Sequence, residues 1–277
     1  MLSPYIIEYK GLSDIKENIS SYFNKFEEHS VVCFRGGDVS KEDQVEILKI
    51  FGDLAGWFPN TTVLEDKDNL EAFNAYAFYS ENHSQAYNEK WGNDDIVITW
   101  HLEHFYRENR TAGAVWNMKT FSCSPESGKT YFVDANKLWE LLNEQEKQIL
   151  ADAKTYFYYF DDVITAPCAS KHFRTNQILA HVDFNANPLE YKYLASYNGF
   201  EPSEPLEKEF NRIMMFLNDQ VKNNENIRIV HKWQKNDVLV PDLFKLIHTI
   251  TGGFKPEERY FHGVWATLTK PDINNMI

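Results

Sequence analysis

Residues 96–104 read IVITWHLEH, a run of β-branched and aromatic residues that ends in two histidines around a leucine and a glutamate. Such a run is typical of a β-strand. Because side chains alternate across a strand, His101 and Glu103 are expected on the same face, where both could bind one metal ion. A His-x-Glu pair also arises by chance, and exposed or hydrogen-bonded polar residues are the commoner explanation. The interpretation therefore depends on the rest of the chain.

Strand-like segments recur on both sides of this run, and helical periodicity is confined to a few segments. Strands are expected at 5–9, 31–34, 112–118, 130–135, 155–160, 227–233, 237–241 and 258–268. Helices are expected after Ser13 as N-cap, over 40–52 with Ser40 at the start, and over 136–152 and 205–223. Many short strands with few helices predict a mostly β fold, a jelly-roll or cupin-like barrel with flanking helices. We expect one domain over residues 1–277.

Residues 57–95 differ from their surroundings. They are rich in Asn, Asp, Glu and aromatic residues, and their periodicity is weak. A long insertion of this kind inside a compact domain is often a lid or substrate loop, although a surface excursion is an equal alternative.

The charge and cysteine content of the chain limit the kinds of binding partner and the compartment that can be expected. The formal net charge is 28 − 41 = −13, which argues against a nucleic-acid backbone or an anionic membrane and leaves small molecules. Cys33, Cys123 and Cys168 are too few and too widely spaced for a disulfide framework or a zinc site, so buried thiols in a reducing cytoplasm are expected. The chain shows neither a signal peptide nor an apolar stretch of membrane-spanning length, so a cytoplasmic protein is expected. A homo-oligomer is compatible with these features.

Three downstream residues strengthen the metal interpretation. His248 follows the expected strand 237–241, and a second histidine would complete a 2-His-1-carboxylate triad, which leaves three positions open on iron(II) for a keto acid and O₂. Arg259 lies eleven residues later on the last expected strand, where its guanidinium could hold the far carboxylate of that keto acid. Thr130 follows the turn SGK and could donate its hydroxyl to the same carboxylate.

Five segments, in order, resemble the taurine dioxygenase-like (TauD/TfdA) family of iron(II)- and 2-oxoglutarate-dependent oxygenases. They are VVCFRGGDVSKEDQVEILKIFGDL, WHLEH, ESGKTYFVDANKLWELLNEQEKQIL, HKWQKNDVLVPDLFKLIH and ERYFHGVW. The resemblance implies a distorted double-stranded β-helix. It implies that His101, Glu103 and His248 are the catalytic iron ligands, and that Thr130 and Arg259 bind 2-oxoglutarate.

The acidic residue of the motif points to a substrate class. Most of the family has Asp where this chain has Glu103, and some amino-acid hydroxylases of the superfamily have Glu, which favours an amino-acid-derived substrate. Related halogenases have a small residue there, so halogenation is not expected. WHLEH and AGAVWNM resemble the branch that works beside isonitrile synthases, which implies hydroxylation or desaturation of a substrate such as tyrosine isonitrile. The alternatives are a hydroxylase of a free amino acid or a sulfonate-type acid, a metal-dependent cupin-like enzyme without 2-oxoglutarate, and a non-catalytic barrel that binds a small ligand.

Other polar residues compete for roles in the site. His181 and Asp183 have the same spacing as the proposed ligand pair, and the alternative is a strand with a polar face. His104 and Arg174 are candidate substrate contacts, although His104 could equally hydrogen-bond to a ligand residue. His262 is expected to face away from Arg259 by strand alternation.

Overall fold

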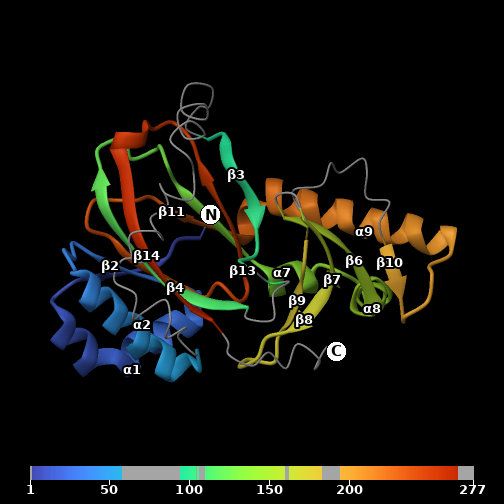
Figure 1. The fold of residues 1–277 in the computed structure, drawn as a ribbon, viewed down its shortest axis with the longest axis horizontal. Coiled ribbons are helices and arrows are strands. Elements are labelled where there is room, and N and C mark those ends of the chain that lie inside the picture. The colour runs from blue at the N-terminus through green and yellow to red at the C-terminus, as the bar shows by residue number, and fades with distance from the viewer. Residues whose placement is uncertain are drawn as a thin grey trace.

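Two β-sheets face each other and form the barrel of the computed structural model, which describes residues 2–57, 94–103, 105, 110–159, 162–182 and 194–267 (Figure 1). The first sheet has the order β11 (Arg228–His231), β5 (Thr130–Asp134), β13 (Leu246–Thr251) and β3 (Ile96–His101). The second has the order β1 (Tyr5–Glu8), β2 (Val31–Arg35), β12 (Val238–Pro241), β4 (Thr111–Phe121) and β14 (Arg259–Thr267).

The strands switch between the two sheets along the chain. β3, β5, β11 and β13 lie in the first sheet, whereas β4, β12 and β14, which come between or after them, lie in the second. All pairs within these sheets are antiparallel except β1 with β2. This switching is the pattern of a jelly roll, so the predicted double-stranded β-helix is confirmed.

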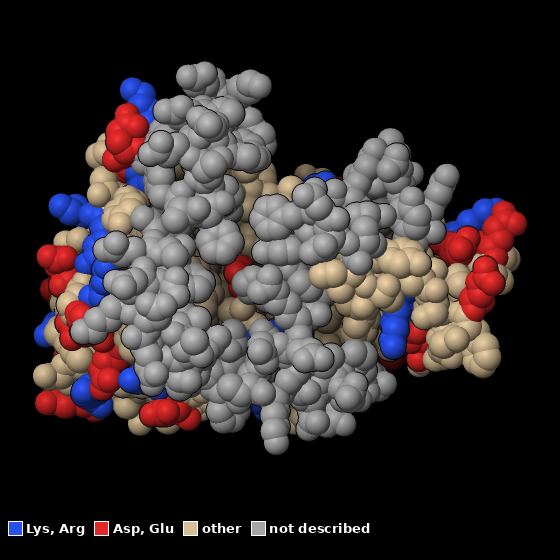
Figure 2. Space-filling model, in the orientation of Figure 1, with Lys and Arg blue, Asp and Glu red and all other residues tan. Residues whose placement is uncertain are grey.

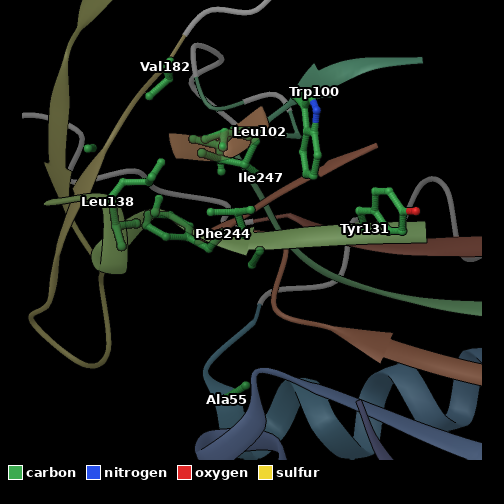
Figure 3. Close-up of a cluster of buried hydrophobic side chains, with 14 of the residues drawn as sticks. Ala55, Trp100, Leu102, Tyr131, Leu138, Val182, Phe244 and Ile247 are labelled. Atoms are coloured by element: carbon green, nitrogen blue, oxygen red, sulfur yellow. The ribbon is translucent and has the colours of Figure 1, made fainter. Parts of the chain in front are cut away.

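Side-chain alternation divides the buried residues into two groups. Along β5, Phe132 packs between the sheets with Trp116, whereas Tyr131 and Val133 belong to a larger cluster outside the first sheet. The intersheet cluster also contains Met118, Trp233, Leu239, Leu246 and Phe261. Figure 3 shows part of the outer cluster, in which Leu102, Ile247 and Phe244 lie together.

Two helices cover the second sheet (Figure 1): α1 (Leu12–His29) and α2 (Lys41–Ala55). α2 begins as predicted, since the Ser40 side chain accepts a hydrogen bond from the Asp43 N–H. It continues beyond the predicted end at Gly52 and ends before Gly56, whose φ of 69° suits glycine. α1 begins at Leu12, so Ser13 lies in its first turn and is not the N-cap.

The remaining helices and short strands lie beside the barrel. They are α7 (Ala135–Glu140), α8 (Glu144–Asp152), α9 (Glu204–Asn223), β6 (Ala153–Tyr159), β7 (Asp162–Pro167), β8 (Ala169–Lys171), β9 (Ile178–Ala180), β10 (Leu194–Tyr197) and the 3₁₀ turns η2 (Glu225–Ile227) and η3 (Pro256–Glu258). The prediction of a single helix over 136–152 is wrong, because the structure has two helices there, α7 and α8. The Asn143 side chain and Glu146 form a reciprocal capping box, which starts α8 as a separate helix.

The proposed lid or substrate loop, 57–95, lies outside the described residues except at its two ends. Among the described helices, none has the length and apolar character needed to cross a bilayer. On the face shown in Figure 2, the described acidic and basic side chains are interspersed.

Candidate metal centre

His101 and His248 face each other across two neighbouring strands. The antiparallel register pairs His248 of β13 with His101 of β3, and their ring centroids are 4.1 Å apart. β3 ends at His101, so a turn rather than strand alternation brings Glu103 to them. Glu103 Oε2 lies 3.4 Å from His101 Nε2 and 3.7 Å from His248 Nε2. The structure thus brings together the three predicted ligands, one ligand atom of each within 4.8 Å of the others.

The surroundings of the two imidazoles determine which nitrogen is presented. His101 Nδ1 lies 2.8 Å from the Thr99 carbonyl oxygen and donates its N–H to it, so Nε2 is the nitrogen that faces Glu103. Burial lowers the pKa of His101, but the hydrogen bond and the charge of Glu103 outweigh burial, and this pKa is raised overall. Burial, followed by repulsion from His101, lowers the pKa of His248 to about 3, so His248 is neutral at pH 7.

The donor set fits a divalent transition metal such as iron(II). Two imidazole nitrogens and one carboxylate oxygen are the 2-His-1-carboxylate set, which leaves coordination positions for further ligands. The His101 and Glu103 side chains are 33% and 18% exposed, so the centre is accessible from one side. On the other side, the rings of Trp116 and Phe132 lie 5.5 and 6.0 Å from the His248 ring and exclude water.

Thr130 and Arg259 converge from opposite sheets. Arg259 is buried, and its guanidinium carbon lies 5.7, 5.5 and 5.2 Å from the ring centroids of Trp233, Phe254 and Phe261, respectively. The Trp233 Nε1–H donates to Thr130 Oγ1 at 2.8 Å. Trp233 therefore contacts both residues, and this is a feature that the sequence interpretation missed. No local sequence pattern indicates this contact, because Trp233 and Thr130 are 103 positions apart.

Of the two proposed substrate contacts, Arg174 and His104, the structure describes only Arg174. Arg174 pairs with Glu27 and lies 3.5 Å from Asp242, beside a cavity lined by Phe26, Glu27, Thr175, Asp242 and others. Within the described part of the chain, no contact of Arg174 involves a residue of the metal centre. His104 lies outside the described residues, as does Asp183.

The competing histidine, His181, has both ring nitrogens engaged. Nδ1 lies 2.9 Å from the Pro167 carbonyl oxygen, and Nε2 lies 2.8 Å from Ser170 Oγ, which also accepts from Arg110. Burial, and then the charge of Arg110, lower the pKa of His181 to about 3. These contacts leave neither nitrogen directed at a metal ion.

A second cluster with metal-ligating side chains, Cys33, His231 and Asp237, is fully buried. Arg35 binds both oxygens of Asp237, at 2.9 and 3.1 Å, and the Gln234 N–H donates to the same carboxylate at 2.9 Å. Burial and the charge of Asp237 hold the pKa of the Cys33 thiol well above its ordinary value, so the thiol keeps its proton. This cluster is therefore a structural ion pair. All three cysteines are free, with Cys33 and Cys168 buried as expected and Cys123 only partly buried.

Comparisons with known proteins agree with this architecture. The family model of the taurine catabolism dioxygenase TauD, TfdA family matches residues 12–265. No curated protein sequence matches the chain. The structure is similar to AAD-2 in complex with Mn(II) and N-oxalylglycine, with a TM-score of 0.63 and 14% identity over 98% of this chain and 97% of that chain. It is similar to the same degree to a taurine dioxygenase from Burkholderia xenovorans (TM-score 0.63, 14% identity, 98% of this chain and 92% of that chain).

The structural likenesses, at this low identity, establish the fold, and the family match covers nearly the whole sequence. The protein is thus a member of the TauD, TfdA family, a 2-oxoglutarate-dependent dioxygenase that uses iron(II) and O₂ to oxidise a small molecule.

Proposed function

We propose that His101, Glu103 and His248 bind the iron(II) ion, and that Thr130 and Arg259 bind the far carboxylate of 2-oxoglutarate. The observation that carries the first assignment is the convergence of two imidazole nitrogens and a carboxylate oxygen within 4.8 Å. When bound, the iron couples the conversion of 2-oxoglutarate and O₂ to succinate and CO₂ with oxidation of a substrate C–H bond.

The residues of the chain have distinct tasks in this proposal. His101 and His248 would bind the ion through Nε2, with the Thr99 carbonyl keeping Nδ1 of His101 as the N–H nitrogen. Metal binding displaces any proton from these Nε2 atoms. Arg259 supplies a buried positive charge for the carboxylate, and Thr130 supplies a hydroxyl donor. Trp116 and Phe132 keep water away from the inner side of the centre.

For the substrate, we propose a small amino-acid-derived molecule that is hydroxylated or desaturated, with tyrosine isonitrile as the specific candidate. The support is Glu103 as the acidic ligand and the resemblance of WHLEH to the isonitrile branch. A sulfonate-type acid is the alternative, because a structural relative is a taurine dioxygenase. The presence of the carboxylate ligand argues against halogenation.

The metal and cosubstrate roles are tested by succinate formation from 2-oxoglutarate with added iron(II). The wild-type protein should form succinate, and Glu103→Ala should not. Glu144→Ala makes the same change at a side chain that is 92% exposed, and it should match the wild type. A wild-type rate in Glu103→Ala would contradict the assignment, and a wild-type protein without succinate formation would favour a non-catalytic barrel.

The substrate class is tested by O₂ consumption with tyrosine isonitrile, L-tyrosine and taurine, each with 2-oxoglutarate. Stimulation by tyrosine isonitrile, with a product that has gained one oxygen atom or lost two hydrogen atoms, is expected. Stimulation by L-tyrosine alone would support the free amino acid alternative. Stimulation by taurine alone would overturn the amino-acid proposal and leave the iron site unaffected.

A further inference from the structure

Trp233 is a buried aromatic residue whose polar atom is directed at the proposed cosubstrate site. It is 1% exposed and follows β11, whose His231 pairs with Thr130 in the antiparallel register. The Phe261 ring stacks on it at 6.3 Å between centroids, and the His231 ring contacts it edge-on at 4.4 Å. With these contacts on its ring, Trp233 holds its N–H on Thr130 at 2.8 Å.

The chemistry of the two groups fixes the direction of this hydrogen bond. An indole nitrogen only donates, whereas a threonine hydroxyl has one hydrogen and two acceptor lone pairs. The bond from Trp233 therefore occupies a lone pair of Thr130 and cannot accept the hydroxyl hydrogen in return. No described residue accepts that hydrogen either, although Thr130 is only 1% exposed. A buried donor without an acceptor costs about 1–3 kcal/mol, so a bound ligand is the natural acceptor.

Arg259 places the expected acceptor next to this hydroxyl. Its guanidinium lies over the Trp233 ring, and its Cδ would be 3.0 Å from a Cβ added at Gly128, two residues before Thr130. A carboxylate held by Arg259 would therefore lie where Thr130 can donate to it.

We infer that Trp233 is a positioning residue, which orients the Thr130 hydroxyl as an obligatory hydrogen-bond donor to the 2-oxoglutarate carboxylate. The inference rests on the proposed roles of Thr130 and Arg259. Trp233 itself acts through Thr130, and its ring supports the guanidinium of Arg259.

The test uses Trp233→Phe, which keeps an aromatic ring against Phe261 and removes the N–H. In the iron-loaded enzyme, the KM for 2-oxoglutarate should rise by roughly twofold to tenfold, the effect of one neutral hydrogen bond, with kcat nearly unchanged. Trp139→Phe makes the same substitution on α7, outside the intersheet cluster, and should leave KM unchanged.

Combining substitutions at Trp233 and Thr130 shows whether Trp233 acts through the Thr130 hydroxyl or only stabilises the surrounding structure. Once Thr130→Val has removed the hydroxyl, Trp233→Phe should have no further effect on KM. A wild-type KM in Trp233→Phe, or effects of the two substitutions that multiply, would overturn the inference. Unchanged KM values in both Thr130→Val and Arg259→Ala would instead overturn the proposed cosubstrate site.

A measurement on the unaltered ring keeps the inference testable if Trp233→Phe does not fold. In NMR spectra, the Trp233 indole N–H resonance is identified as the one that Thr130→Val displaces. This resonance is then followed in wild-type protein loaded with Zn(II). Adding 2-oxoglutarate should shift this resonance, and a resonance that does not respond would contradict the inference.

Discussion

At the scale of single residues, Gly128 shapes the space for Arg259. Its φ is +59°, a conformation that costs other residues about 1–2 kcal/mol, and a Cβ there would lie 3.0 Å from Arg259 Cδ. Gly128→Ala should therefore lower stability and also displace the guanidinium, raising the KM for 2-oxoglutarate. Gly199 has φ +78° but open space around it, so Gly199→Ala should lower stability alone. Equal KM values in the two variants would contradict this account of Gly128.

The residue types of the site could be predicted from sequence, but not all of their contacts. His101, Glu103 and His248 stand out because metal-binding side chains end or follow strand-like runs, and the structure brings them together. The bond from Trp233 to Thr130 joins residues 103 positions apart, and no local pattern reports it. Arg174 looks equally suitable in the sequence, but its place depends on Glu27 of a distant helix.

At the scale of elements, Asp237 joins three strands. It lies just before β12, binds Arg35 at the end of β2, and has His231 Nε2 of β11 at 3.2 Å from Oδ2. Asp237→Ala would leave Arg35, whose side chain is 31% exposed, without its carboxylate, and would remove the hydrogen bonds that Asp237 accepts, a loss of about 1.5–3 kcal/mol. Urea unfolding should show a loss of this order. Asp53→Ala on the exposed face of α2 should change the free energy of unfolding by less than about 0.5 kcal/mol. A similar small change in Asp237→Ala would show that the junction is not stabilising.

Helices and strands can be predicted from the sequence where a cap residue or an apolar stripe within the element marks them. Ser40 and the apolar stripe of α9 predict helices that the structure has at nearly the same bounds. The break between α7 and α8 depends on one capping box, which a continuous stripe of leucines conceals. His248 lies within β13, a strand that was not predicted although four of the six residues in LIHTIT are β-branched.

At the scale of the whole molecule, the buried, neutral side chain of His181 makes the free energy of unfolding depend on pH. Burial and then Arg110 lower the pKa of His181 to about 3, against about 6.5 in an unfolded chain. The unfolded state therefore binds the proton first, so the stabilisation is complete above pH 6.5 and is lost as the pH falls toward 3, by up to about 1.4 kcal/mol per pH unit. His181→Gln should lower this pH dependence between pH 6.5 and 4.5 in urea unfolding. An unchanged slope would mean that His181 is not the group involved.

Anaerobic calorimetric titration with iron(II) tests whether His101, Glu103 and His248 form the metal centre. We predict one high-affinity ion per chain in the wild type. His248→Ala should weaken binding by more than roughly 100-fold, because losing even an outer partner of a ligand costs 10–100-fold. Cys33→Ser alters the second cluster of ligand-type side chains among the described residues and should bind iron as the wild type does. Wild-type affinity in His248→Ala, or lost binding in Cys33→Ser, would contradict the assignment of His101, Glu103 and His248 as the metal centre.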